Sequence, residues 1–140
     1  CVLYNLFSIG YDKNNQNEED AMYDIVLLDA DMTIWAVEPE NAAILAGGTI
    51  GTHIQMGIGD GLIPDILNRD IITDICIVND QEAIETSKRL ASEEGIMCGI
   101  SSGTNVAAAI KLARKLGKGK TVVTVLPDTA ERYFSTPLFE

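Results

Sequence analysis

From Thr33 onward, short apolar runs alternate with amphipathic helical stretches, and this alternation constrains the fold more than any other feature. Residues 33–40 form a β-branched and apolar run that ends in Glu-Pro-Glu, which predicts a strand. Further apolar runs at residues 74–78, 96–100 and 120–128 predict strands in the same way. Strands that alternate with helices pack most readily as a parallel sheet covered by those helices. We therefore expect an α/β fold, with a parallel sheet flanked by helices.

Two longer helices are predicted from their end signals. Asn79 and Glu82 have the spacing of a capping box, and Gly95 is placed to end the helix that follows them. Its predicted apolar face is made of Ala83, Ile84, Ser87, Leu90 and Ala91. A second helix is expected over residues 101–116, opened by two serines as cap residues and closed by Gly117. Its predicted apolar face carries Val106, Ile110, Ala113 and Leu116. Shorter helical stretches are expected in residues 41–48 and at the end of residues 51–67.

The composition narrows the possible functions. The 140 residues are 46% hydrophobic, which is enough for one domain with its own core. A net charge of −11 argues against nucleic-acid binding, because phosphate contacts need clusters of Lys and Arg. The longest apolar runs are far shorter than a membrane span. We expect neither nucleic acid nor a membrane as a partner.

The cysteines and the single histidine do not form a metal-binding pattern. Cys1, Cys76 and Cys98 are widely spaced, and His53 has no cysteine or second histidine near it, so no metal site is expected. An odd number of cysteines without a signal peptide indicates reduced thiols in a cytoplasmic protein. The chain begins with Cys1 rather than Met, and we expect it to be a piece of a longer protein.

The segment Gly99-Ile100-Ser101-Ser102-Gly103 matches the G-x-S-x-G pattern of a serine-hydrolase nucleophile elbow. In α/β-hydrolases the catalytic histidine follows the serine, whereas His53 precedes Ser101, and no other residue is a suitable base. A hydrolase is therefore disfavoured. Two interpretations stay open: the serines cap a helix, or Ser101 meets the ring nitrogen or anion of a ligand at the carboxyl end of a parallel strand.

A second glycine cluster contains Gly57, Gly59 and Gly61. It lacks the Lys-Ser/Thr of a phosphate-binding P-loop, and its spacing is not that of the dinucleotide-binding fingerprint. It is either a flexible turn or a place where the backbone comes close to a ligand. His53 is most simply a hydrogen-bonded loop histidine, and no role is assigned to it.

Taken together, four stretches resemble the carboxy-terminal half of the cysteine synthase (O-acetylserine sulfhydrylase) family of fold-type II pyridoxal 5′-phosphate (PLP) enzymes. They occur in family order at residues 36–48, 51–67, 80–128 and 131–139. The resemblance implies that residues 33–140 are the carboxy-terminal α/β portion of a β-replacement enzyme, within the larger domain of the tryptophan synthase β-like fold. Residues 1–32 are unmatched: a polar tract from Asp12 to Asp20 is expected to be a loop, and residues 24–32 are compatible with a buried strand. Cystathionine β-synthase and related β-replacement enzymes share parts of the pattern.

The resemblance also assigns roles to residues. Ser101 is expected to hydrogen-bond the pyridine nitrogen of PLP, and Gly57, Gly59 and Gly61 to border the substrate pocket. A neutral hydroxyl beside the positive end of a helix disfavours a charged ring nitrogen, which suits β-elimination better than transamination. Pro127 and Asp128 are expected near the same edge of the cofactor.

The chain departs from the family pattern in important places. The family's Schiff-base lysine belongs to the amino-terminal half and has no match here. The family's phosphate-binding G-T-G-G-T loop is expected shortly before the strand at residues 33–40, where this chain has the unmatched residues 1–32 and no such loop. Met56 stands where a glutamine usually precedes the Gly57 loop. The chain has six lysines, none at a position that the family uses: Lys13, Lys88, Lys111, Lys115, Lys118 and Lys120. We therefore expect no catalytic residue in this chain, and we expect the chain alone not to hold PLP covalently.

The resemblance thus implies a partial cysteine synthase. The full-length enzyme would make L-cysteine from O-acetylserine and sulfide, and the family suggests a homodimer with serine acetyltransferase as a further partner. The alternatives are a non-catalytic remnant or interaction module that keeps the fold, and a cystathionine β-synthase-like enzyme.

Overall fold

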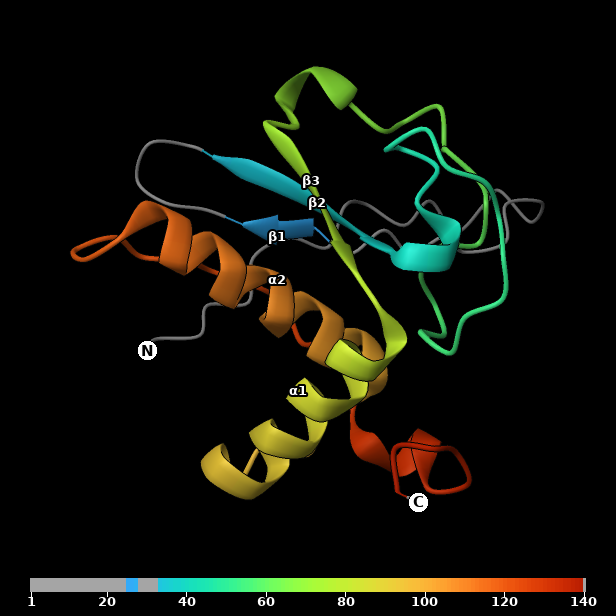
Figure 1. The fold of residues 1–140 in the computed structure, drawn as a ribbon, viewed down its shortest axis with the longest axis vertical. Helices are drawn as coiled ribbons and strands as arrows, with labels where there is room; N and C mark the ends of the chain where they lie inside the picture. Colours follow the sequence, from blue (N-terminus) through green and yellow to red (C-terminus); the bar gives the residue numbers. More distant parts are fainter. Residues whose placement is uncertain (1–24, 28–32, 140) are drawn as a thin grey trace, which may run out of the picture.

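The computed structural model describes residues 25–27 and 33–139 (Figure 1). The expectations for residues 1–24 and 28–32 lie outside the described residues. The strands are β1 (Ile25–Leu27), β2 (Ile34–Pro39) and β3 (Asp74–Val78), and the helices are α1 (Asp80–Glu94) and α2 (Ile100–Leu116). Short 3₁₀ helices lie at Glu40–Ala42, Arg69–Ile71 and Ala130–Tyr133.

The described sheet has the order β1-β2-β3. β2 and β3 are parallel, with Trp35 opposite Asp74 and Pro39 opposite Val78. β1 runs antiparallel to β2 and pairs Ile25 with Ala36. The predicted parallel α/β arrangement is confirmed for β2 and β3, and β1 adds an antiparallel edge to it.

Two of the predicted strands and one predicted helix are wrong. Residues 96–100 contribute a single bridge, between Cys98 and Thr129. Within residues 120–128 only Val123 takes part in a bridge, and the segment belongs to no strand of the described sheet. An apolar run becomes a strand only when a neighbouring strand pairs with its backbone, and none of the described strands does so here. Residues 62–67 form a turn, closed by the Leu67 amide donating to the Pro64 carbonyl (2.9 Å), because so short a segment does not repay helix nucleation.

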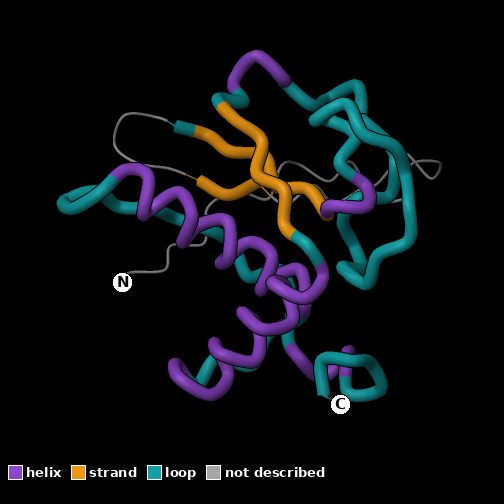
Figure 2. The backbone as a smooth tube through the Cα atoms, viewed as in Figure 1, coloured by secondary structure: helices purple, strands orange, loops and turns teal. Residues whose placement is uncertain are grey.

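The two long helices pack against each other, and α2 packs against the sheet (Figure 2). Alternate residues of the strands, including Val37 on β2 and Cys76 and Val78 on β3, join Ala108 and Leu112 of α2 in one buried core. The predicted α1 ends are confirmed: the Asn79 side chain accepts from the Glu82 amide (2.9 Å), and Gly95 adopts a left-handed conformation.

The start and the buried face of α2 differ from the prediction. Gly99 is the N-cap, with an extended backbone, so the serines lie inside the first turn rather than capping it. The fully buried positions further along include Thr104, Ala107, Ala108 and Leu112, whereas the predicted Ala113 is exposed. Small residues of α2 face inward because α1 crosses α2 closely. The spacing of the larger apolar residues in the sequence did not show this crossing.

This close crossing occurs at Gly103. A Cβ atom there would overlap the carbonyl oxygen of Ala83 and the hydroxyl of Ser87, both on α1. Only glycine therefore fits between the helices without displacing α1. Within the described part of the chain, no helix is long and apolar enough to cross a membrane.

Candidate active site

The first turn of α2 lies at the carboxyl edge of the parallel strands. At the carboxy-terminal end of α2, Lys115 Nζ is 3.1 Å from an oxygen of Asp74, the first residue of β3. The same atom is 4.9 Å from the centre of the Trp35 ring, near the start of β2. Near the amino-terminal end of α2, Thr104 is hydrogen-bonded to Gln55, and Gln55 is hydrogen-bonded to Val78, the last residue of β3. α2 therefore runs antiparallel to β2 and β3, and its positive end points to the sheet edge where α/β proteins bind ligands.

Ser101 lies in this first turn, with 4% of its surface exposed. The turn is held from both sides. The Ser87 hydroxyl donates to the Gly99 carbonyl (2.9 Å), and the Gly99 amide donates to the Asp128 carbonyl (3.3 Å). A Cβ atom on Gly99 would overlap the side chains of Asp128 and Tyr133, so glycine is needed for this close approach. The backbone around Ser101 is consequently fixed by α1 and by the segment that follows α2.

Polar side chains gather beside this turn, and sequence reasoning identified only part of the group. Asp128 accepts a hydrogen bond from the Tyr133 hydroxyl, while its other carboxylate oxygen is buried without a partner in the described part of the chain. Buried oxygens of Thr124 and Asn105 are likewise unpaired among the described residues. Buried polar atoms normally have partners, so these unpaired oxygens on α2 and the segment alongside it fit a polar ligand here.

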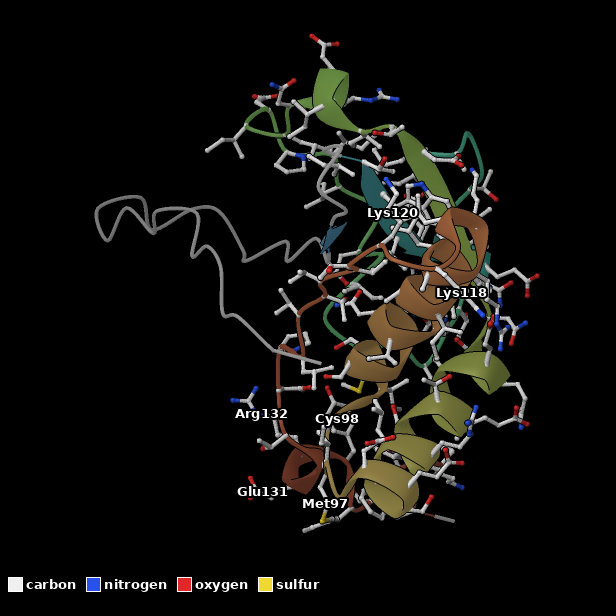
Figure 3. The ribbon with its side chains drawn as sticks, turned by 90° about the vertical axis from the view of Figure 1, so that its left-hand side faces the viewer. Met97, Cys98, Lys118, Lys120, Glu131 and Arg132 are labelled. Carbon is white, nitrogen blue, oxygen red and sulfur yellow. The ribbon has the colours of Figure 1, made fainter. Side chains whose placement is uncertain are left out.

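Cys98, immediately before the N-cap, is buried (Figure 3). Burial raises the pKa of its thiol, and the negative charge of Asp128 acts in the same direction, although a hydrogen bond with Ser102 opposes them. The thiol is therefore protonated at neutral pH, and Cys98 is not an activated nucleophile.

The glycine cluster lies beside the carboxyl end of β2. Gly57, Gly59 and Gly61 all have positive φ, at 87°, 72° and 81°. A Cβ atom on Gly59 would lie 2.8 Å from the Pro39 side chain and 3.0 Å from His53 Nε2. Both the backbone conformation and the lack of space therefore require glycine at position 59. The structure thus brings the two sequence motifs, the glycine loop and the α2 start, to the same edge of the sheet.

The His53 ring packs against this loop. Its Nδ1 atom is buried and has no hydrogen-bond partner among the described residues, so the expected loop hydrogen bond is not seen at that nitrogen.

Gln55 and Glu38 are buried polar residues that sequence reasoning missed. The Glu38 carboxylate accepts from the backbone amides of Leu45 (2.7 Å) and Ala46 (3.0 Å), which fixes the chain after β2. Gln55 connects the glycine loop with three other elements. A polar residue just before a glycine cluster was a usable signal, but only the fold shows that its side chain turns inward.

The described lysines lie away from the first turn of α2 wherever their contacts are known. Lys111 pairs with Glu82 (2.7 Å), and Lys115 pairs with Asp74, both on the half of α2 remote from Ser101. Lys115 is fourteen positions after Ser101 on the helix, which corresponds to about 21 Å along the axis. Lys118 and Lys120 follow the end of α2 in the closing turn (Figure 3).

The fold and the site define a class of protein. The chain belongs to the family of pyridoxal-phosphate-dependent enzymes, whose model matches residues 22–128. PLP is the cofactor of this family, which confirms the expectation from the sequence. The match takes in β1 as well as residues 33–128.

Individual relatives point to one branch of that class. A cysteine synthase from Staphylococcus aureus (strain N315) is 54% identical over 106 residues, which are 76% of this chain and 34% of that protein. A probable cysteine synthase from Bacillus subtilis (strain 168) is 45% identical over 109 residues, 78% of this chain and 35% of that protein. The chain therefore spans about a third of the length of these relatives.

Solved structures agree with this assignment. A cysteine synthase from Entamoeba histolytica superimposes with a TM-score of 0.74 at 42% identity, covering 76% of this chain and 32% of that one. An O-acetylserine-dependent cystathionine β-synthase from Helicobacter pylori gives a TM-score of 0.70 at 36% identity, covering 77% and 35%. These neighbours confirm the α/β fold and its similarity to part of a cysteine synthase.

Proposed function

We propose that this chain is the carboxy-terminal part of a cysteine synthase, which in its complete form makes L-cysteine from O-acetylserine and sulfide by β-replacement. Residues 33–140 form this portion in our proposal. The position of Ser101 carries it: a buried serine lies in the first turn of a helix at the carboxyl edge of parallel strands, next to a glycine loop. The 54% identity to a cysteine synthase favours sulfide and O-acetylserine over the substrates of other β-replacement enzymes.

The residues present fit one end of the cofactor. When bound, PLP supplies the electron sink that makes β-replacement at an amino acid possible. The Ser101 hydroxyl would donate a hydrogen bond to the pyridine nitrogen. The positive end of α2 would keep that nitrogen neutral, since a second positive charge beside it is unfavourable. The Gly57–Gly61 loop would border the amino-acid substrate, because its backbone allows a close approach.

The described residues do not fit the other end of the cofactor. The lysines with known contacts lie on the remote half of α2 and pair with carboxylates of α1 and β3. A covalent attachment needs a lysine amine that is neutral and close to the aldehyde. We therefore expect that the 140-residue chain, mixed with PLP, reduced with borohydride and mapped by mass spectrometry, carries no stoichiometric label. Labelling of one lysine, with cysteine formed from O-acetylserine and sulfide, would show instead that the chain is a complete enzyme.

A chimaera tests the function directly. This chain would replace the matching 106 residues of the Staphylococcus aureus cysteine synthase, which supplies the rest of the domain. We expect cysteine formation from O-acetylserine and sulfide, at a rate well above that with homocysteine as the thiol donor. A preference for homocysteine would favour a cystathionine β-synthase. A folded, PLP-loaded but inactive chimaera would favour the alternative of a non-catalytic remnant.

The partners follow from the same proposal. The complete enzyme would be a cytoplasmic homodimer that also binds serine acetyltransferase. Light scattering of the chimaera, alone and with that acetyltransferase, measures both associations. A monomeric chimaera that does not bind the acetyltransferase would contradict this part of the proposal without affecting the catalytic part.

A further inference from the structure

Gln55 is the most completely satisfied buried polar side chain near the proposed site. It is 0% exposed, although it lies in a loop between Ile54 and Met56, and Met56 is 62% exposed. Its amide nitrogen donates to the carbonyl oxygen of Val78 (3.0 Å) and to a carboxylate oxygen of Asp80 (2.9 Å). Its amide oxygen accepts from the Thr104 hydroxyl (2.7 Å). Both N–H groups and the oxygen of this side chain are therefore used.

These bonds join four parts of the fold at one point. Val78 ends β3, Asp80 begins α1, and Thr104 lies one turn after Ser101 on α2. The other carboxylate oxygen of Asp80 accepts from the Ile54 backbone amide (3.2 Å), so the loop is held by its backbone as well. The Gly57–Gly61 segment begins two residues after Gln55, and its glycines make it flexible unless something outside it fixes its start.

The chemistry of the site admits an amide and rejects a carboxylate. Two acceptors, the Val78 carbonyl and the Asp80 carboxylate, face the Gln55 nitrogen, and one donor, the Thr104 hydroxyl, faces its oxygen. A glutamate here would turn an oxygen toward two other oxygens, one of them charged. A leucine would remove the side-chain donor to the Val78 carbonyl in a buried place, which is costly, and would leave the Thr104 hydroxyl only its longer bond to the Ile100 carbonyl (3.2 Å).

We propose that Gln55 is a positioning residue, which fixes the Gly57–Gly61 loop relative to the first turn of α2 and thereby sets substrate affinity. This inference rests on the proposed function, because the loop is taken to border the substrate and Ser101 to contact the cofactor. Gln55 itself touches neither. Loss of its bonds should free the glycine loop while Ser101 stays held by Ser87 and Asp128 through Gly99.

The first test is hydrogen exchange on the 140-residue chain, which needs no activity. In Gln55→Leu, the amides of residues 54–58 should exchange about 5- to 30-fold faster, the factor expected for the loss of one or two buried hydrogen bonds. Thr104→Val, which keeps the shape but removes one donor, should give a smaller increase in the same amides. Met56→Ala is the matched control, since it changes the exposed neighbour, and it should leave them unchanged. Equal exchange in wild type and Gln55→Leu, with α1 and α2 still protected, would overturn the proposal.

The second test separates positioning from a general structural role. In the chimaera, Gln55→Leu should raise KM for O-acetylserine about 5- to 30-fold with a much smaller change in kcat, because loop order affects binding more than the chemistry. The absorption spectrum of bound PLP should not shift, since Ser101 is undisturbed. A fall in kcat with KM unchanged would overturn the positioning role, whereas an inactive parent chimaera would refute the proposed function and leave the exchange result to decide on Gln55.

Discussion

Replacement of Gly103 by alanine tests the close crossing of α1 and α2. Alanine is the better helix former, and inside a helix a Gly→Ala change alone gains about 1 kcal/mol. Gly103 is one of the buried residues of α2, and its missing side chain faces the backbone of α1. Helix propensity and the tertiary structure therefore predict opposite signs for the same substitution.

The magnitude follows from the atoms that the new methyl group would meet. It would overlap the Ala83 carbonyl oxygen and the Ser87 hydroxyl, and the Ser87 backbone nitrogen would be 2.9 Å away. Overpacking of this kind costs about 1–3 kcal/mol. Displacing Ser87 also weakens its hydrogen bond to Gly99, which costs about 0.5–1.5 kcal/mol. After subtracting the gain in propensity of about 1 kcal/mol, the net loss is about 2 kcal/mol.

Urea unfolding followed by far-UV circular dichroism measures the effect. We expect Gly103→Ala to lower the urea midpoint with an unchanged slope. An unchanged slope means that unfolding exposes the same amount of surface, so the lower midpoint indicates a loss of stability. Ala113→Gly is the control, because Ala113 is exposed on the same helix and should lose about 1 kcal/mol from propensity alone. A Gly103→Ala chain as stable as the wild type, or more stable, would refute the close helix crossing.

Further predictions concern other parts of the fold and site. In the chimaera, Ser101→Ala should keep the fold and weaken turnover, and Ser101→Asp should change the balance of reactions by favouring ring protonation; unchanged kinetics in both would contradict contact with the ring nitrogen. Asn79→Ala should lower the free energy of unfolding by about 1 kcal/mol through loss of the α1 cap, and urea midpoints measure it. The Lys115 hydrogen bond lowers the pKa of the Asp74 carboxyl below its ordinary value. The small contribution of this ion pair to stability should therefore be present near neutral pH and lost as pH falls through the folded pKa. Urea unfolding of Asp74→Asn against wild type checks this, and a difference that persists in strong acid would exclude it. The buried Cys98 thiol, whose pKa burial raises, should react with a thiol reagent far more slowly in the native chain than in urea.

The elements with strong local signals were predictable from the sequence. β2 and β3 combine β-branched residues with clear ends, and α1 has both a capping Asn79 and a terminal Gly95, so local chemistry alone determines where they begin and end. Ser101 and the glycine cluster were likewise visible as motifs, and the resemblance to a PLP-dependent family rested on their order. The roles of these residues stay predictions.

The sequence by itself therefore determined where β2, β3 and α1 form and made the two motifs visible, because capping, glycine conformation and strand propensity act within a few residues. Only the tertiary structure decided that residues 120–128 do not form a strand of the described sheet, since a strand requires a neighbour to pair with. It also decided which face of α2 is buried, through the crossing at Gly103, and it alone turned Gln55 inward and Met56 outward. These outcomes depend on contacts between residues far apart in the chain, for example the 49 positions that separate Gln55 from Thr104. No local pattern specifies such contacts, because each forms only when the whole domain packs.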